Sequence, residues 1–197
     1  MTAVGLVLAA GAGRRMGGPK ALVRLTDDGP TLVETAVARV VEGGCERAVV
    51  VVGACAEQVA ALVEGTGAEV VRADDWDEGM GASLRAGLAH LGVGDDDLAL
   101  VTLVDLPDVT ADMIGRVVTT ALRDGRSALV RAAYDGVPGH PVAIGRDHWA
   151  AVLTTARGDR GARDHLRATP HRLVECGDLA TGRDLDTTGD LDDLRRG

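Results

Sequence analysis

The stretch LVLAAGAGRRMGGPKAL at residues 6–22 decides the fold, because an apolar run passes directly into a turn rich in glycine and positive charge. The apolar run predicts a buried strand, which begins near residue 3. The glycines predict a turn whose backbone N–H groups can approach an anion closely. The stretch therefore predicts an anion-binding loop at the carboxyl end of the first strand.

Two familiar phosphate-binding turns fail on their spacing. A P-loop needs Ser or Thr after its lysine to bind magnesium, whereas Lys20 is followed by Ala21. A dinucleotide-binding turn has the spacing G-x-G-x-x-G, and Gly11, Gly13 and Gly17 are spread one residue too widely. The second strand, which ends VVVVGAC, also lacks the acidic residue that would bind a ribose.

Short apolar runs alternate with helical periodicities along the rest of the chain. Strands are predicted at 3–9, 47–53, 68–73, 98–105, 127–134 and 171–177, and helices at 31–43, 56–65, 81–91, 111–125, 146–156 and 161–169. Segment 135–145 is predicted to be a loop with a small extra strand, and the acidic tail to end in a short helix. This alternation predicts an α/β fold: a single Rossmann-like three-layer domain over residues 1–197 with a mostly parallel sheet.

The composition limits the classes of partner. Hydrophobic residues make up 46% of the chain and Phe is absent, so the core must consist of Ala, Val and Leu. A net charge of −9 disfavours binding to nucleic acid or to an anionic membrane, and an anionic substrate would require local cations or a metal ion. The scattered Cys45, Cys55 and Cys176 indicate neither a zinc site nor a disulfide framework and favour a cytoplasmic location. The N-terminus lacks the basic region of a signal peptide, and no apolar run is long enough to span a bilayer.

The whole string LAAGAGRRMGGPK resembles the signature of the MobA-like nucleotidyltransferases, which activate a phosphorylated acceptor with an NTP and release pyrophosphate. The resemblance implies the nucleotide-diphospho-sugar transferase type of fold. It also implies catalytic roles for Arg15 and Lys20 on the phosphates, while Arg14 falls at a variable position and is expected at the surface. The nucleotide-binding residues that it implies in this turn are Leu8, Ala9, Ala10, Gly11, Ala12, Gly13 and Lys20.

Two carboxylates are candidates for a metal site. Asp105 follows the apolar run of LVTLVDLPDV and should point to the same crevice as the glycine turn, where a carboxylate beside a triphosphate requires a hard cation. The tail DLDTTGDL resembles the family's D-[IL]-D-T-P-x-D-L signature, with Thr188 at the usual proline, and implies Asp186 as the second metal ligand. The expected ion is Mg²⁺, for which Mn²⁺ can substitute. Asp108 and Asp190 are interpreted as helix caps.

Three further segments match the family. WDEGMGASLRAGL at 76–88 implies that Gly81, Ala82 and Ser83 lie beside the nucleobase, although Ser83 could equally be an N-cap and Arg85 a surface residue. VPGHPVAIG at 137–145 and RGDRGARDHL at 157–166 resemble the molybdenum-cofactor branch. They imply three acceptor-binding residues, His140, Arg160 and Arg163, with ion pairs to Asp159 or Asp164 as the competing role for the two arginines.

The expected function is Mg²⁺-dependent transfer of CMP from CTP to molybdopterin or the molybdenum cofactor, with release of pyrophosphate. LAAG in place of LAGG favours cytidine over guanosine within the family. The alternatives are a related transferase that uses GTP or another acceptor (a sugar 1-phosphate, a polyol phosphate or phospholactate) and a carrier of the cofactor that transfers no nucleotide. The expected partners are these small molecules, with a molybdoenzyme or its chaperone as a candidate protein partner, and neither nucleic acid nor membrane.

Overall fold

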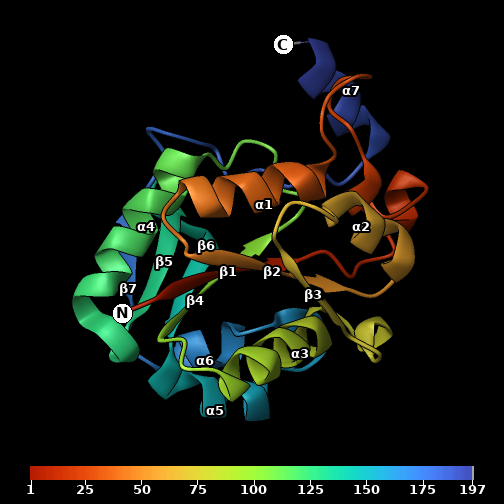
Figure 1. Cartoon of the computed structure of the whole chain (residues 1–197). Coiled ribbons are helices and arrows are strands. Elements are labelled where there is room, and N and C mark those ends of the chain that lie inside the picture. Colours follow the sequence, from red (N-terminus) through yellow and green to blue (C-terminus); the bar gives the residue numbers. More distant parts are fainter. Residues whose placement is uncertain (197) are drawn as a thin grey trace.

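The structure, a computed structural model, describes residues 1–196 and contains a seven-stranded sheet (Figure 1). The strands are β1 (Ala3–Leu8), β2 (Arg47–Val52), β3 (Glu69–Arg72), β4 (Leu98–Leu103), β5 (Leu129–Tyr134), β6 (Val137–Gly145) and β7 (Arg172–Glu175). Their order in the sheet is β3-β2-β1-β4-β6-β5-β7. All pairs are parallel except those of β6, which runs antiparallel to both β4 and β5. The predicted α/β class with a mostly parallel sheet is confirmed.

Helices cover both faces of this sheet and give three layers (Figure 1). The helices are α1 (Leu32–Glu42), α2 (Ala56–Val63), α3 (Met80–Val93), α4 (Ala111–Asp124), α5 (Arg146–Thr155), α6 (Arg163–Ala168) and α7 (Thr188–Arg196). In Figure 1, α1, α2 and α4 lie on one face, while α3, α5 and α6 lie on the other. Among the described residues, none of the helices combines the length and the apolar character needed to cross a membrane.

The core consists of small aliphatic side chains, as the absence of Phe requires. One apolar cluster lies between the sheet and α1, α2 and α4, and a second between the sheet and α3, α5 and α6. Strands buried on both faces explain why β1, β2 and β4 are continuous apolar runs in the sequence rather than alternating ones. Thr31 begins α1 with a capping box to Glu34, and Thr110 caps α4.

The structure corrects the expectation of a loop with only a small extra strand over 135–145. Val137–Gly145 is a nine-residue strand, and its second half lies between β4 and β5. Pro138 and Pro141 caused the error, because proline cannot donate to a central ladder. Both prolines precede Val142, which is the first residue of β6 that pairs with β4. The backbone N–H groups that the prolines lack are therefore not needed for hydrogen bonds to β4.

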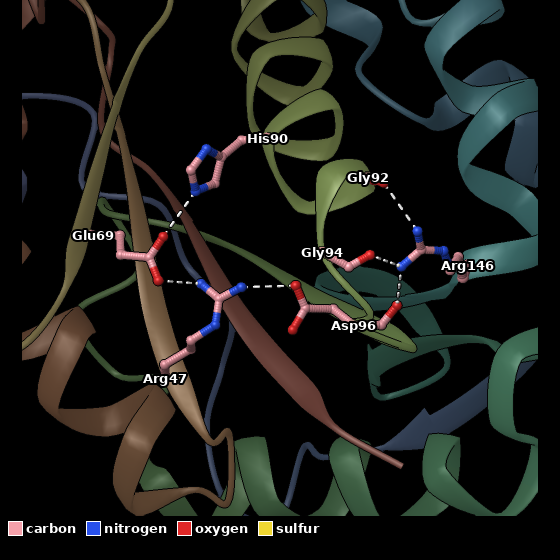
Figure 2. Close-up of polar contacts among 7 residues, drawn as sticks. All are labelled: Arg47, Glu69, His90, Gly92, Gly94, Asp96 and Arg146. Atoms are coloured by element: carbon pink, nitrogen blue, oxygen red, sulfur yellow. Dashed lines mark hydrogen bonds and ion pairs between the residues drawn. The ribbon is translucent and has the colours of Figure 1, made fainter.

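A polar network ties together the amino ends of the strands, at the sheet edge opposite to the carboxyl ends of β1 and β4 (Figure 2). Arg47 contacts Glu69 at 2.6 Å and Asp96 at 2.7 Å, and His90 contacts the same Glu69 at 2.8 Å. The Arg146 guanidinium donates to the carbonyl oxygens of Gly92, Gly94 and Asp96. These contacts join β2, β3, the end of α3 and the start of α5.

Candidate active site

A cleft of about 450 Å³ lies at the carboxyl ends of β1 and β4. The chain leaves β1 toward β2 on one side, while β4 pairs on the other, so the cleft lies at a topological switch point of the sheet, where open α/β sheets bind ligands. It is lined by Leu8, Ala10, Gly11, Ala12, Gly13, Arg14, Arg15, Lys20, Trp76, Asp77, Gly79, Met80, Ser83, Leu103, Val104, Asp105, Asp159 and Asp186.

The glycine-rich loop forms a tight turn along this cleft. Gly13 has φ 57° and ψ 39°, in the left-handed region, and its carbonyl accepts hydrogen bonds from the N–H groups of Met16 and Gly18. Arg14 and Arg15 belong to the following 3₁₀ turn, both are exposed, and neither forms an ion pair with a described side chain. Because both line the cleft, the structure does not separate Arg14 from Arg15 as the sequence analysis did.

Lys20 lies between the two predicted metal-binding carboxylates. Its Nζ is 2.8 Å from Oδ2 of Asp105 and 2.7 Å from Oδ1 of Asp186. Burial opposes the charged amine, but the hydrogen bonds to Asp105 and Asp186 outweigh it and raise the pKa of Lys20. The structure thus brings together three residues that are separated by up to 166 positions in the sequence.

The tail segment 178–187, here called the strap, carries Asp186 to this point. The backbone N–H of Leu185, whose side chain is buried, donates to the carbonyl of Asp105 at 2.9 Å. Thr187 and Asp190 cap the start of α7 by exchanging hydrogen bonds, which agrees with the capping role predicted for Asp190. Asp108 does not cap α4 as expected: Thr110 does so, and Oδ2 of Asp108 instead accepts hydrogen bonds from Thr181 and Gly182 of the strap.

The donor set fits a divalent metal ion. Oδ1 of Asp105 is buried and has no hydrogen-bond partner among the described residues, so one oxygen of this carboxylate is available to a ligand. The described part of the chain has no group of three or more His, Cys, Asp or Glu side chains arranged to hold a metal. Two carboxylates suffice for Mg²⁺ when phosphate oxygens and water complete its shell.

The balance of charge along the cleft differs from expectation. The sequence analysis requires local cations or a metal for an anionic substrate, yet Arg14, Arg15 and Lys20 face four carboxylates on the lining: Asp77, Asp105, Asp159 and Asp186. The protein lining alone is therefore not net positive. A bound divalent cation would reverse this balance.

The residues predicted to lie beside the nucleobase are only partly found in the cleft. Ser83 lines the cleft, but it lies inside α3 and not at an N-cap position, because α3 begins at Met80. Ala9, Gly81 and Ala82 are not part of the lining. A Cβ at Gly81 would meet the backbone of Arg157 at 2.7 Å, so this glycine serves close packing against the end of α5.

Trp76 and Met80 line the cleft beside Ser83, and the sequence analysis assigned neither of them a role. Trp76 packs against Gly53, where a Cβ would lie 2.5 Å from its side chain. Its place in the family-like stretch 76–88 was an available signal. Arg85 points elsewhere: it donates to the carbonyl of Ala156 and pairs with Glu78 at 2.8 Å, which are structural contacts.

The predicted acceptor residues lie in a second, smaller chamber of about 70 Å³ that shares Leu8, Met80 and Asp159 with the cleft. His140, Arg160 and Arg163 all line this chamber. Arg160 pairs with Asp164 at 3.1 Å, which is the competing role considered for it.

Arg131 is the member of this chamber that sequence reasoning missed. It donates to the carbonyls of Gly139 and Pro138 and so fixes the backbone that carries His140. Neither Arg131 nor Arg163 forms an ion pair with a carboxylate in the described part of the chain. Burial, together with the charges of Arg131 and Arg163, lowers the pKa of His140 to about 4, so its ring is neutral near pH 7.

Comparisons with known proteins identify a family and a similar characterised protein. The sequence profile of the MobA-like NTP transferase domain matches residues 5–174. Over 193 residues the chain is 40% identical to the nicotine blue oxidoreductase of Paenarthrobacter nicotinovorans, covering 93% of this chain and 91% of that protein.

Solved structures match over the whole chain. A nucleotidyl transferase from Methanothermobacter thermautotroptrophicus has a TM-score of 0.79 and 25% identity, covering 99% of this chain and 96% of that one. Rv0371c from Mycobacterium tuberculosis H37Rv has a TM-score of 0.80 and 27% identity, covering 100% and 98% respectively. Another structure of Rv0371c is a complex with manganese.

Proposed function

The chain belongs to the MobA-like NTP transferase family, and from this premise we propose that it transfers CMP from CTP to a phosphorylated acceptor and releases pyrophosphate. The proposed acceptor is molybdopterin or the molybdenum cofactor, and the proposed protein partner is a molybdoenzyme or its chaperone. Residues 1–197 are assigned to one nucleotidyltransferase domain.

One observation carries this proposal: the meeting of Lys20, Asp105 and Asp186 beside the glycine turn of a single cleft. Glycine backbone N–H groups and a lysine suit phosphate oxygens, while two carboxylates suit a hard cation. We assign the triphosphate to the turn formed by Leu8, Ala10, Gly11, Ala12 and Gly13; the N–H of Ala9 instead donates to the carbonyl of Val51 in the sheet.

Asp105 and Asp186 are the residues that would hold Mg²⁺ or Mn²⁺. Bound there, the ion would supply the positive charge that the lining lacks and would polarise phosphate oxygens. Lys20 and Arg15 would neutralise the charge that develops on the departing pyrophosphate.

The reaction needs little proton transfer. An oxygen of the acceptor's terminal phosphate attacks the α-phosphorus, a new P–O bond forms, and the bond between the α-phosphorus and the bridging oxygen breaks as pyrophosphate leaves. Since this nucleophile is already an anion at neutral pH, no general base is required. Catalysis by this chain is then alignment and charge neutralisation.

The base is assigned to the cleft and the acceptor to the adjoining smaller chamber. Ser83 would contact the edge of the base. Gly81 and Ala82 would contribute only through the packing of the first turn of α3, to which Ser83 belongs. His140 and Arg163 would contact the acceptor. Arg160 would do so only after leaving Asp164.

A substrate panel tests the proposal. CTP, GTP, ATP and UTP are each incubated with Mg²⁺ and with molybdopterin or a sugar phosphate, and pyrophosphate release is measured. We expect the highest release with CTP and molybdopterin. A strong preference for GTP would contradict the cytidine assignment, and binding of molybdopterin without pyrophosphate release would indicate a carrier.

Substitutions at the two central groups give a second test. Lys20→Ala and Asp105→Ala are each expected to fold normally and to lose transfer activity by about 100-fold or more, because each removes a charge that acts on the phosphates. Asp74→Ala is the matched control, since Asp74 is exposed and lies outside the cleft lining. Near-wild-type turnover in either cleft variant, with folding checked by circular dichroism, would refute these roles.

A second candidate function is reduction of a planar substrate, favoured by the 40% identity to nicotine blue oxidoreductase. Trp76 and Met80 give the cleft an apolar wall that suits a flat aromatic molecule. The absent dinucleotide fingerprint weighs against a bound nicotinamide cofactor. Loss of the blue absorbance on incubation with nicotine blue and NADH or NADPH, without pyrophosphate release from any NTP, would favour this candidate.

A further inference from the structure

Lys20 is the one lysine among the 21 lysine and arginine residues of the chain. Lysine carries a compact charge on a flexible stem, whereas arginine presents a rigid planar fork of donors. A compact amine can exchange one set of oxygen partners for another without matching a fork. The chain thus keeps its single amine side chain for the position between Asp105 and Asp186.

The amine occupies the same two carboxylates to which the proposed function assigns the metal. Both contacts are shorter than 3 Å; the Lys20 and Asp105 side chains are 17% and 19% exposed, and that of Asp186 is 51% exposed. No other basic side chain in the described part of the chain pairs with either carboxylate. A divalent ion bound to the free Oδ1 of Asp105 and to Asp186 would lie beside the ammonium group, and the two positive charges would repel each other.

We infer that Lys20 is a resident counter-ion that free metal displaces poorly and the metal–nucleotide complex displaces readily. The inference rests on the proposed function, because it takes Asp105 and Asp186 as the metal ligands. When metal arrives alone, the displaced amine loses two carboxylates and gains no anion. When metal arrives with a nucleotide, the amine gains phosphate oxygens instead. Metal and nucleotide therefore bind with positive coupling, and by linkage the coupling is reciprocal.

Binding of Mn²⁺ to the protein without nucleotide tests the displacement. Free Mn²⁺ is followed by electron paramagnetic resonance for the wild type and for Lys20→Met. We expect the variant to bind Mn²⁺ roughly tenfold or more tightly than the wild type, a typical size for coupling between sites. Lys20→Gln serves as a second variant in case methionine disturbs folding.

Arg14→Met is the matched control, because it removes one positive charge from the cleft lining without touching either carboxylate. We expect its Mn²⁺ affinity to rise much less than that of Lys20→Met. Adding Asp105→Asn to Lys20→Met should abolish the gain and so locate it. An equal gain in Arg14→Met would overturn the inference in favour of a general field effect, as would unchanged affinity in both Lys20 variants.

The single lysine also permits a direct observation. Protein labelled with ¹³Cε-lysine gives one lysine side-chain signal by nuclear magnetic resonance. We expect that signal to shift little with millimolar Mg²⁺ alone and strongly with Mg²⁺ and CTP. The same large shift with Mg²⁺ alone would overturn the inference.

Failure of the inference remains distinct from failure of the proposed function. Pyrophosphate release by the wild type decides the function, whatever the Mn²⁺ measurements give. Transfer activity combined with tight Mn²⁺ binding by nucleotide-free wild type would reject the counter-ion role alone. If no pyrophosphate is released but Lys20→Met still binds Mn²⁺ more tightly, the proposed transferase activity is wrong and the counter-ion role of Lys20 still holds.

Discussion

Gly13 shows how one residue sets the shape of the glycine-rich loop. Its φ of 57° is strained for any residue with a Cβ, and that Cβ would lie 1.9 Å from the carbonyl oxygen of Gly18. We expect Gly13→Ala to open the turn and weaken binding of Mg²⁺–CTP by about tenfold or more, since the conformational cost alone is about 1–2 kcal/mol. Isothermal titration calorimetry measures the affinity.

The control for this turn is its own neighbour. A Cβ at Gly18 would meet nothing within 4 Å, so Gly18→Ala changes the same loop without the clash. Its affinity for Mg²⁺–CTP should stay within a few-fold of the wild type. Equal affinities in the two variants would show that the left-handed turn is not needed for nucleotide binding.

His140 predicts how stability depends on pH. Its pKa is about 4 in the folded protein, against an ordinary value near 6.5. Between these values the unfolded chain takes up a proton that the folded chain does not, so the free energy of unfolding falls as pH drops from 6.5 to 4. The loss from this residue is at most about 3 kcal/mol. Urea denaturation at several pH values measures it.

His140→Gln isolates that effect from the carboxylates, which also lose stability in acid. The variant has no imidazole to protonate, so its free energy of unfolding should fall less steeply than that of the wild type between pH 6.5 and 4. Parallel curves for the two proteins would mean that the His140 ring is open to water in the folded state.

Sequence reasoning named residues in recognisable local motifs, several of which line the cleft, and missed residues whose position depends on packing. Lys20 lies in the glycine-rich segment that follows β1, and Asp105 lies just after β4. Both belong to recognisable local motifs, and the structure brings them together. Arg131 follows no signal of its own: it enters the second chamber only because β5 and β6 pair around it. Gly81 looked like a binding residue because packing glycines and ligand-binding glycines are identical in a sequence.

The same limit applies to whole elements. Continuous aliphatic runs predicted β1, β2 and β4 almost to the residue, because strands buried on both faces leave no other pattern. The strand β6 was expected only as a loop with a small extra strand, because its prolines are tolerated where pairing with β4 has stopped. A local pattern carries no information on where a neighbouring strand stops.

The junction of α3 and α5 depends on one arginine at the edge of the sheet opposite to the cleft (Figure 2). Arg146 donates to the carbonyls of Gly92 and Gly94, which close the end of α3, and to that of Asp96. We expect Arg146→Met to lower the free energy of unfolding by about 2–3 kcal/mol, because charge-assisted bonds to backbone groups are lost. Chemical denaturation measures the loss.

Arg126→Met is the comparison at the same edge. Arg126 is half exposed and pairs with Asp97 and Asp147 at 3.2 and 3.8 Å, so its loss should cost less than about 1 kcal/mol. Neither variant should change the KM for CTP, since both side chains lie far from the cleft. Equal destabilisation by the two substitutions would show that the helix-end contacts of Arg146 add nothing beyond a surface ion pair.

At the scale of the whole molecule, the site is assembled by bringing distant segments to one edge of the sheet. The glycine turn and Asp105 arrive through adjacent parallel strands, so the topology of the sheet places them automatically. Asp186 is positioned differently, because it lies on the strap, which belongs to no strand of the sheet. The strap is therefore fixed by a backbone hydrogen bond from Leu185 and by side-chain contacts, so the position of Asp186 depends on residues outside the cleft lining.

Asp108 is the side chain that holds the strap. Its Oδ2 accepts hydrogen bonds from the backbone and hydroxyl of Thr181, both at 2.6 Å, and from the N–H of Gly182 at 3.1 Å. We expect Asp108→Ala to release the strap, move Asp186 away from Asp105 and weaken Mn²⁺–CTP binding by about tenfold, since small displacements of a charged group degrade a site steeply. Asp178→Ala is the control, because Asp178 pairs with Arg116 at the exposed start of the strap, away from the metal carboxylates. A loss of affinity confined to Asp108→Ala, with the fold intact by circular dichroism, would identify Asp108 as the residue that positions Asp186. Equal affinity in both variants would mean that the buried Leu185 and its hydrogen bond to Asp105 are sufficient.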